Sequence, residues 1–299
     1  MSDMKQQHPE VPIIIIERDE DPKDSLHLGL APRRRTWLRR LAWAMCIVAA
    51  VLLSLTAFEL WRYYFDIGVP VSVSPTENIE KLKLPAKKET AEVVMTSDSL
   101  LGVALDIYAI HGLQASIEFQ EPDTADRSVY LYCRSADHTV DGKYLGSLVA
   151  KGKALQSDRT RLGYMAMTAN NMVIGISRSD KVKDYVMEQG GSYFRQFVLV
   201  SDGVIPSRFY LHGKVERRAI GRIDNTLYYI TTRHKETLWG FADALREYGF
   251  ADAIYITGGM DYGFYRSRDG QRHDIGHVDD YPYKKWNGII PWLVFRKHS

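Results

Sequence analysis

The stretch that decides the fold reads Lys235-Glu-Thr-Leu-Trp-Gly-Phe-Ala-Asp-Ala-Leu-Arg-Glu-Tyr248, followed by Gly249-Phe-Ala-Asp-Ala-Ile-Tyr-Ile-Thr-Gly-Gly-Met-Asp261. Its first part places apolar residues on one helical face and ends at a glycine, which predicts a helix over Lys235–Tyr248. Its second part predicts a strand over Ala253–Ile256 that runs into the turn at Gly258 and Gly259. Helix, strand and turn together bring backbone amides and polar side chains to the carboxyl end of a strand. Such positions commonly bind ligands.

The sequence around this stretch predicts many strands and few helices. A second helix is expected over Asp180–Gln189, with Ser179 as its cap and Gly190 and Gly191 at its end. Segments rich in β-branched and aromatic residues are strand candidates: Val103–Ile110, Val129–Cys133, Met172–Ile176, Phe197–Ser201, Arg208–Leu211, Leu227–Thr231, Ala253–Ile256 and Trp292–Phe295. We therefore expect an α+β domain built on a large mixed, mostly antiparallel sheet with a few helices.

A membrane-spanning helix is expected before this domain. The segment Leu41–Phe58 holds eighteen residues without a charge, and it directly follows an arginine cluster. The cluster and the flanking aromatic residues are Arg33, Arg34, Arg35, Arg39, Arg40, Trp37, Trp43 and Trp61. Interfacial tryptophans and a basic flank are typical of a transmembrane helix, and the basic side is expected to stay in the cytoplasm.

Two alternatives to an anchor are a cleaved signal peptide and a buried helix of a soluble protein. A signal peptide would start nearer residue 1, and Glu59–Phe65 offers no small-x-small cleavage site. We expect a disordered cytoplasmic tail at 1–40, an anchor at 41–61, a tether at 62–90 and the folded domain at 91–299. That domain would be periplasmic or otherwise extracytoplasmic.

Charge and composition argue against several classes of function. The net charge of +2 supplies no basic field for nucleic acid, and no nucleic-acid partner is expected. The two cysteines, Cys46 and Cys133, cannot supply a cysteine-based metal site. The histidines are dispersed, and His273 and His277 have helical spacing in a segment that predicts a loop. No metal and no cofactor are expected.

Three segments, in order, carry a family resemblance: Met167-Thr-Ala-Asn-Asn-Met-Val173; Val200-Ser-Asp-Gly-Val204 with Glu216-Arg-Arg-Ala-Ile-Gly221 and Leu227-Tyr-Tyr-Ile230; and Leu238–Tyr248 with the strand and turn to Gly259. The chain resembles the phosphodiester glycosidase domain family, whose members include the lysosomal uncovering enzyme, an N-acetylglucosamine-1-phosphodiester α-N-acetylglucosaminidase. The resemblance covers roughly residues 95–298. It implies hydrolysis of sugar-1-phosphodiester linkages, here in glycans or glycolipids of a cell envelope.

The resemblance also implies site residues. Arg217 is expected to bind phosphate, because a guanidinium fork donates to two oxygens at once. Asn170 and the amides of Gly258 and Gly259 would position the sugar. Asp261 stands where the family pattern has another residue, and it is the expected acid or base because it could supply the missing carboxylate if the turn is shifted by a few residues.

Neighbouring side chains complete the expected site. Tyr262 and Arg266 are further substrate-binding candidates. The chain departs from the family pattern at Thr257, where the family has an aspartate. A hydroxyl cannot replace a carboxylate in acid–base work at neutral pH.

That departure leaves two other functions open. One is a catalytically inactive ectodomain of the same fold that binds glycans or acts as a scaffold. The other is a purely structural envelope protein that meets its partners through residues 1–32. A fold alone does not decide among the three.

Overall fold

The computed structural model describes residues 32–64, 74–86, 89–135, 137, 144–206, 209, 213–277 and 290–297, with side chains omitted at 32–35 and 62–64. Several sequence-based expectations lie outside these residues. They are the disordered tail up to residue 31, the tether at 65–73 and most of the expected strand Arg208–Leu211. The compact unit that carries the candidate site falls within residues 57–299.

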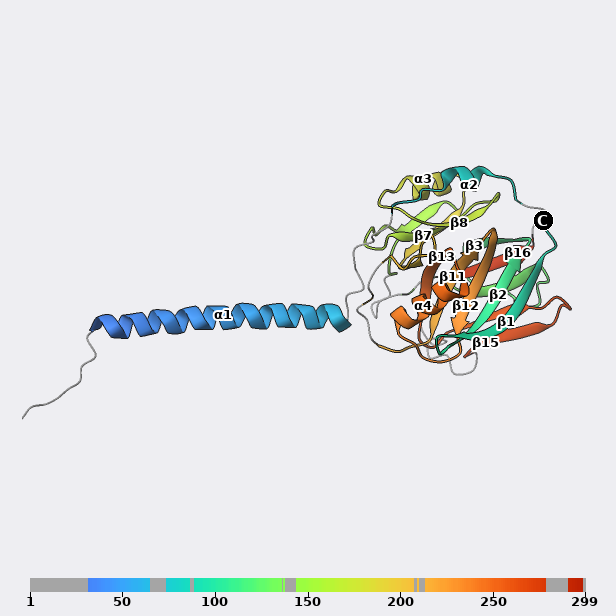
Figure 1. The fold of residues 1–299 in the computed structure, drawn as a ribbon. Coiled ribbons are helices and arrows are strands. Elements are labelled where there is room, and N and C mark those ends of the chain that lie inside the picture. The colour runs from blue at the N-terminus through green and yellow to red at the C-terminus, as the bar shows by residue number, and fades with distance from the viewer. Residues whose placement is uncertain are drawn as a thin grey trace, which may run out of the picture. The chain divides into compact units, whose positions relative to one another are not determined.

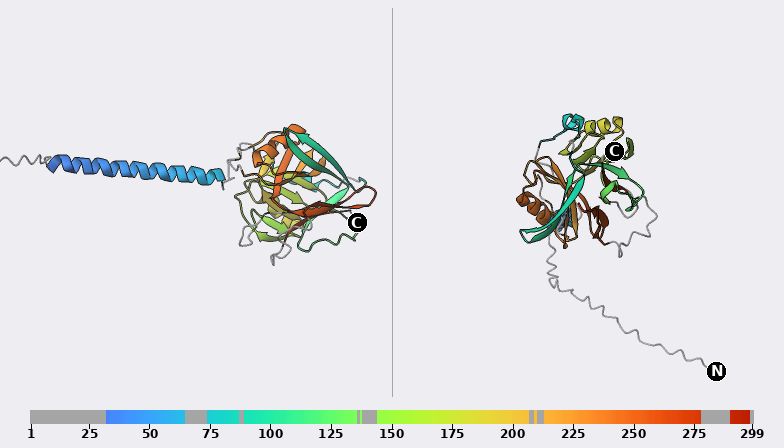
Figure 2. Two further views of the ribbon diagram at one scale, coloured as in Figure 1. Left: turned by 90° about the horizontal axis from the view of Figure 1, so that it is seen from below. Right: turned by 90° about the vertical axis from the view of Figure 1, so that its right-hand side faces the viewer.

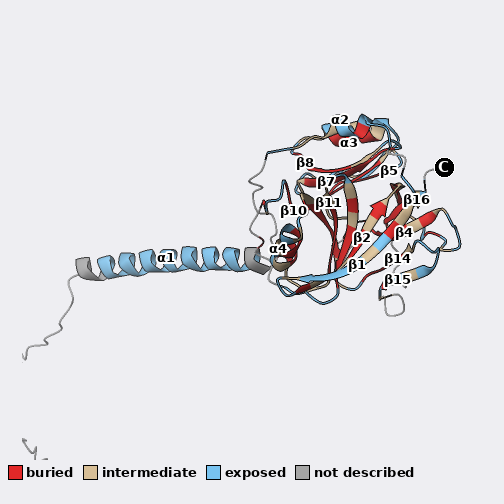
Figure 3. Ribbon diagram, turned by 45° about the vertical axis from the view of Figure 1, so that its right-hand side comes forward, coloured by how far each residue is buried: buried red, intermediate tan, exposed pale blue. Residues whose placement is uncertain are grey.

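Helix α1 (Pro32–Tyr64) contains the expected anchor. Within it, Thr36–Trp61 forms a run of 26 residues with a mean hydropathy of 2.3, long and apolar enough to cross a membrane. At 1.5 Å per residue the run is about 39 Å long, which exceeds a hydrocarbon core of about 30 Å. All of its residues are exposed, as the pale blue of α1 in Figure 3 shows. The helix starts earlier than the expected boundary at 41, so residues 32–40 are helical rather than part of a disordered tail.

The folded unit consists of three antiparallel sheets (Figure 1). The first has the order β1-β2-β12-β11-β13-β10. Its strands are β1 (Glu92–Leu100), β2 (Val103–His111), β10 (Val198–Val200), β11 (Arg217–Ile223), β12 (Thr226–Thr232) and β13 (Asp252–Gly258). Strand β11 lies between β12 and β13, and its pairing with β13 shifts register between Arg217 and Ala219.

The second and third sheets have five strands each. The order β15-β14-β4-β16-β3 joins β15 (Arg272–Gly276), β14 (Tyr262–Arg266), β4 (Val129–Arg134), β16 (Trp292–Lys297) and β3 (Leu113–Glu118). The order β6-β5-β9-β7-β8 joins β6 (Lys153–Gln156), β5 (Leu148–Ala150), β9 (Ser192–Gln196), β7 (Gly163–Met167) and β8 (Met172–Ile176). The predicted α+β class with antiparallel pairing is confirmed, but three sheets stand where one large mixed sheet was expected.

Three short helices cover two of the sheets. Helix α4 (Leu238–Tyr248) packs on the six-stranded sheet, with Phe241 and Leu245 fully buried. Helices α2 (Ile79–Lys83) and α3 (Lys181–Glu188) lie side by side over the β6-β5-β9-β7-β8 sheet in Figure 1 and in the right-hand view of Figure 2. Leu82 of α2 is fully buried, so residues expected to form a tether pack on the domain instead.

Helix α4 ends at Tyr248, as the sequence predicts, but it begins at Leu238 rather than at Lys235. The Thr237 hydroxyl accepts a hydrogen bond from the amide of Gly240, which caps the first turn. Gly249 has φ of 102°, a left-handed conformation that glycine adopts without strain. The chain then enters β13, buried along most of its length in the centre of the fold. Helix α4, Gly249 and β13 together position the turn at Gly258 and Gly259.

Candidate functional site

The candidate site lies where two sheets meet. Strand β13 belongs to the six-stranded sheet and β14 to the β15-β14-β4-β16-β3 sheet, so the chain crosses between sheets through Gly259, Met260 and Asp261. The first residue of β11, Arg217, pairs with Gly258 at the end of β13. We call the ionisable and hydroxyl side chains gathered here the polar cluster: Arg134, Asp137, Glu216, Arg217, Arg218, Tyr255, Thr257, Asp261 and His277.

Asp261 is the buried carboxyl group of the polar cluster, only 1% exposed. The Thr257 hydroxyl donates to its Oδ2 at 2.9 Å, and the amide of Tyr262 donates to its Oδ1 at 2.8 Å. Burial raises the pKa of Asp261 above its usual value, although Arg218, Arg134 and both hydrogen bonds act in the opposite direction. The Thr257 hydroxyl therefore orients the carboxyl group of Asp261.

Asp137 supplies a second carboxyl group three residues after β4 ends. Burial raises its pKa to about 7, and the charge of Asp261 adds to the effect. Arg134, a hydrogen bond from the Gly258 amide and Arg218 counteract part of this shift. A carboxyl group that titrates near neutral pH is suited to acid–base catalysis, because it exchanges protons readily at that pH.

Arg218 connects the carboxyl groups to the edge of the cluster. Its guanidinium donates to the Gly259 carbonyl at 2.7 Å and to Glu216 at 2.9 Å. The other oxygen of Glu216 lies 2.7 Å from Nε2 of His277, whose side chain is 38% exposed. The pKa of Arg218 is raised: burial opposes its charge, but Tyr229, Asp261 and Glu216 outweigh that effect. Arg218 is thus a fixed cation beside Asp261.

Arg217, the expected phosphate ligand, makes its hydrogen bonds to other groups of the protein. Its Nε donates to the carbonyl of Glu236 at 3.0 Å and Nη2 to that of Gly213 at 2.7 Å. Its Nη1 donates to the Tyr255 hydroxyl at 3.3 Å. Both Arg217 and Arg218 are 97% buried. The register shift after Arg217 explains why two adjacent arginines both join the polar cluster, where regular alternation would have separated them.

Gly258 and Gly259 also use their amides internally. The amide of Gly258 donates to Asp137, and that of Gly259 donates to the Glu216 carbonyl at 3.0 Å. A Cβ atom at Gly258 would lie 2.2 Å from the Tyr255 hydroxyl, which only glycine avoids. Gly259 has φ of 79° and open space around it. The turn therefore holds Asp137 and Arg218 in position, and its amides are occupied.

Tyr262 and Arg266 point to other partners. The Tyr262 hydroxyl donates to Glu121 at 2.7 Å, and its ring packs edge-on against Trp292. Arg266 donates to main-chain carbonyls of Val129, Gly270 and Thr124. Arg266 is four residues from Tyr262 along β14, about 13 Å at the rise of a strand. It stabilises the loops there and lies apart from Asp261.

Asn170 lies at a different end of the fold. It borders a cavity of about 530 Å³ that is lined at the turns β2–β3, β7–β8 and β11–β12. Among the described residues, none of the polar cluster lines this cavity. Arg218 of β11 pairs with Thr231 of β12, whereas Leu227 of β12 lines the cavity. Four residues separate these points, about 13 Å along the strand. Asn170, Arg217, Gly258 and Asp261 do not share one cleft.

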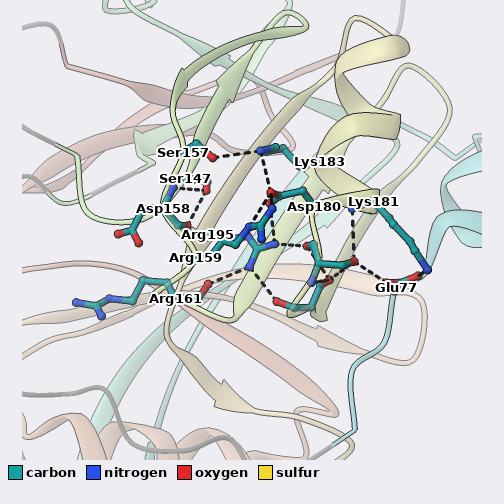
Figure 4. A network of polar contacts seen from close by, with 12 residues as sticks. Glu77, Ser147, Ser157, Asp158, Arg159, Arg161, Asp180, Lys181, Lys183 and Arg195 are labelled. Carbon is teal, nitrogen blue, oxygen red and sulfur yellow. Dashed lines mark hydrogen bonds and ion pairs between the residues drawn. The ribbon is translucent and has the colours of Figure 1, made fainter.

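Arg195 belongs to a second buried network, on the β6-β5-β9-β7-β8 sheet (Figure 4). Its guanidinium donates to the carbonyls of Ser177, at 2.9 Å, and Ser179, and it pairs with Asp180 at 3.4 Å. Arg159 and Lys183 also pair with Asp180. These contacts fix the start of α3 against β9.

Sequence reasoning missed four members of the polar cluster as site residues: Arg134, Asp137, Glu216 and His277. One signal was available for the first two, because they follow the apolar strand Val129–Cys133 at its end. Another was the charged triplet Glu216-Arg217-Arg218 directly before an apolar strand. In the described part of the chain, no three His, Cys, Asp or Glu side chains are placed to hold a metal ion.

Comparison with known proteins identifies the fold. No protein-family model and no curated protein matches the sequence. The zebrafish N-acetylglucosamine-1-phosphodiester α-N-acetylglucosaminidase catalytic domain, auto-inhibited by its pro-peptide, is similar in structure, with a TM-score of 0.50 and 12% identity over 71% of this chain and 86% of that one. A hypothetical protein from Synechocystis aligns with a TM-score of 0.49 and 9% identity over 68% of this chain and 62% of that one. The likeness to the zebrafish domain shows a phosphodiester glycosidase-like fold, and no activity follows from it.

Proposed function

We propose that the folded unit is a hydrolase of sugar-1-phosphodiester linkages and that the polar cluster is its reaction centre. The observation that carries this proposal is the pair of carboxyl groups with raised pKa, Asp137 and Asp261, beside the cations Arg134 and Arg218. Pairs of carboxyl groups in unlike environments are typical of enzymes that cleave glycosidic bonds. The fold of the zebrafish enzyme supports the same reaction class.

The arginines and the carboxyl groups would have different roles in the hydrolysis. The phosphate is a leaving group that develops negative charge, and Arg218 with Arg134 would stabilise it electrostatically. Asp137, with a pKa of about 7, is suited to take a proton from the attacking water, because its ionised and neutral forms are both populated at neutral pH. Asp261 would balance the positive charge of the neighbouring arginines, and the hydrogen bond from Thr257 would fix its orientation. Arg218 thus takes the role first expected of Arg217.

An aryl phosphodiester of N-acetylglucosamine 1-phosphate tests the proposal, with full-length protein in lipid nanodiscs. Asp137→Asn is expected to lower turnover about 10²–10⁴-fold, the usual contribution of a general acid or base. Arg218→Lys is expected to lower it too, since an ammonium cannot reproduce the guanidinium fork. The matched control is Asp202→Asn, in an exposed turn outside the cluster. Absence of turnover in the wild type, or equal turnover in all variants, would refute a catalytic role.

We also propose that α1 anchors the chain as a single-pass protein, with its amino end in the cytoplasm and the folded unit outside it. The arginines before the apolar run support this orientation. A cysteine at Ser99, which is exposed on β1, would react with a membrane-impermeant maleimide in intact cells. Cys133 is buried and Cys46 lies in the apolar run, so background labelling is expected to be low. Labelling only after lysis would reverse the proposed topology.

A second candidate function is an inactive ectodomain that binds glycans. The observation favouring it is that the turn's amides and all three guanidinium nitrogens of Arg217 are already bonded within the protein. Thr257 also occupies the position of the family aspartate. Glycan binding by a wild type that shows no turnover would favour this function, whereas turnover abolished by Asp137→Asn would exclude it.

A further inference from the structure

Strand β1 forms one edge of the six-stranded sheet and pairs with β2 from Glu92 to Leu100 without a register shift. Its second half, from Thr96 to Ser99, is exposed. The strand contains no proline and no lysine. Proteins usually protect a sheet edge with such residues, with a bulge or with a covering segment, because an open edge binds further strands. The edge of β1 is therefore a surface suited to strand addition.

Other sheet edges carry such protection. At the opposite edge of the same sheet, β10 has only three residues and a register shift. Strand β6 carries Lys153 and a register shift of its own. Along β8, the amide and hydroxyl of Thr76 and the side chain of Asn78 make hydrogen bonds to the edge. The nine residues of β1 have none of these features.

The turn after β1 shows which of its main-chain groups face outward. Leu101 and Gly102 have φ of 51° and 80°, the left-handed pair of a two-residue type I′ hairpin. Leu100 and Val103 flank this turn, so they exchange hydrogen bonds, and alternate residues back along β1 bond to β2 in the same way. The main-chain groups of the residues between them point away from β2. These residues are Val93, Met95, Ser97 and Ser99.

The outward groups in the exposed half of β1 have room for new partners. In the described part of the chain, no hydrogen bond reaches the outward main-chain groups of Met95 and Ser97. The Ser99 amide donates to Oδ1 of Asp98 at 2.7 Å, in an exposed segment where water can take over the carboxylate at little net cost. Donors and acceptors at alternate residues are what an added antiparallel strand requires.

We propose that β1 pairs with β1 of a second copy of this chain, in antiparallel orientation about a twofold axis at Ser97. Such a contact joins the same surface of both copies. It pairs Ser97 with Ser97 of the second copy, and it sets Val94 opposite Leu100, so that two apolar side chains meet. None of the polar cluster lies on β1, so this pairing is independent of the proposed hydrolysis.

Charge and apolarity select this register over its neighbours. Moving the axis two residues toward Glu92 would set that carboxylate opposite Asp98, and like charges placed directly opposite are unfavourable. Moving the axis by one residue would set the apolar Val94 opposite Asp98. With the axis at Ser97, Asp98 lies opposite a threonine and no carboxylate lies opposite another. The edge is thus complementary to itself, which favours a second copy as its partner.

Disulfide cross-linking of the full-length protein in membranes tests the register. A Cys46→Ser background removes the exposed thiol, and Cys133 is buried. Ser97→Cys is expected to form a dimer, because residues paired across the axis bring their Cα atoms to about 5.5 Å, within the range of a disulfide. The control is Lys153→Cys on the exposed edge strand β6, which should cross-link about tenfold less because no twofold contact joins two copies there. Absence of the Ser97→Cys dimer, or an equal yield for Lys153→Cys, would overturn the proposal.

Light scattering of the full-length protein in detergent measures the dimer without a cross-link. Ser97→Pro removes an outward amide that β2 does not use, so the hairpin should remain paired. Dimerisation should weaken about tenfold, because the main-chain hydrogen bonds across the axis are lost. Ser97→Ala keeps the amide and is the matched control, with an unchanged association constant. A monomeric wild type, or a dimer of equal strength in Ser97→Pro, would contradict pairing through β1.

A charge test leaves the fold intact, because Thr96 and Asp98 are both exposed. Thr96→Lys places an ammonium opposite Asp98 of the second copy and should strengthen dimerisation about threefold, whereas Thr96→Asp should weaken it by a similar factor. With the axis at Thr96 instead, the new lysine would lie opposite itself and weaken the dimer. Weaker dimerisation of Thr96→Lys, or no change in either variant, would therefore overturn the proposed register.

Discussion

Two networks in this fold each place a carboxyl group beside basic side chains, yet the pKa of one carboxyl group is lowered and that of the other is raised. Around Asp180, burial alone would raise the pKa of the carboxyl group, but hydrogen bonds and charges from Arg159 and Lys183 bring it below its usual value. Around Asp261, Arg218 and Arg134 act in the same sense, yet burial dominates and the pKa is raised. The number of cations is similar, so the balance between desolvation and pairing decides the difference.

The geometry of the two networks explains this difference. The side chain of Asp180 is 13% exposed and lies in ion pairs with Arg159, Lys183 and Arg195 (Figure 4). Asp261 is 1% exposed, and it accepts hydrogen bonds from a hydroxyl and an amide. A paired, ionised carboxylate stabilises a fold, whereas a carboxyl group with raised pKa is available for proton transfer. The comparison marks the first network as structural and the second as a functional candidate.

The largest stability effect is expected in the Asp180 network. Arg195→Met leaves the carbonyls of Ser177 and Ser179 without this buried donor and removes one of the two buried cations beside Asp180, the other being Lys183. Removing one partner of a buried ion pair costs about 3–5 kcal/mol of unfolding free energy. Chemical denaturation followed by near-ultraviolet circular dichroism measures this loss.

The control is Arg159→Ala, which removes another partner of Asp180 whose own side chain is 66% exposed. Exposed pairs contribute at most about 1 kcal/mol, so this variant should remain close to the wild type. Equal losses for Arg195→Met and Arg159→Ala would contradict the structural role given to the buried arginine.

Local patterns predicted much of the fold. The apolar face of α4 and Gly249 specify the helix and its C-terminal end within one short segment, so no distant contact is needed to recognise it. The expected strands did not include β1, β3, β9 or the short β5 and β6. The segment around His273 was expected to be a loop, but it forms β15. The division into three sheets depends on strands far apart in the chain, such as β4 beside β16, and local pattern contains no such information.

The site was less predictable than the fold. Gly258 and Asp261 were found because they lie in one continuous motif. Arg217 was assigned by resemblance, and the sequence does not show that its guanidinium is bonded within the protein while that of Arg218 lies beside Asp261. Asp137 was missed because its neighbours in the cluster include Gly258 and Asp261, which are more than a hundred positions away in the sequence. The resemblance assigned Asn170 to the same site as Asp261. In the structure, Asn170 and the polar cluster lie at opposite ends of β12.

A smaller effect is expected from the pH dependence of the polar cluster. The pKa of Asp137 is about 7 in the folded state, above its unfolded value, so the folded protein binds more protons between about pH 4 and pH 7. Stability should therefore fall as pH rises through this window. The loss is on the order of 2 kcal/mol, after a discount for the partial exposure of Asp137.

Asp137→Asn is the matched variant for this effect. An amide does not titrate, so the slope of unfolding free energy between pH 4 and pH 7 should flatten. In Asp180→Asn the same slope should persist, because the pKa of Asp180 is lowered and its contribution is lost only at more acidic pH. A slope that survives Asp137→Asn would assign the pH dependence to another group.

The smallest effect concerns the close approach of Gly258 to Tyr255. A Cβ atom at position 258 would lie 2.2 Å from the Tyr255 hydroxyl, so Gly258→Ala is expected to cost about 1–2 kcal/mol through overpacking. The obstructing atom is the end of a side chain, and Tyr255→Phe removes it. The double variant Gly258→Ala/Tyr255→Phe should therefore be more stable than Gly258→Ala alone, although Arg217 loses its contact with the hydroxyl. Thermal unfolding of both single variants and the double variant measures the coupling between the two sites. Simple addition of the two single effects would show that the Tyr255 hydroxyl is not what excludes a side chain at position 258, and Val215 Cγ2 at 3.1 Å would be the next obstruction to examine.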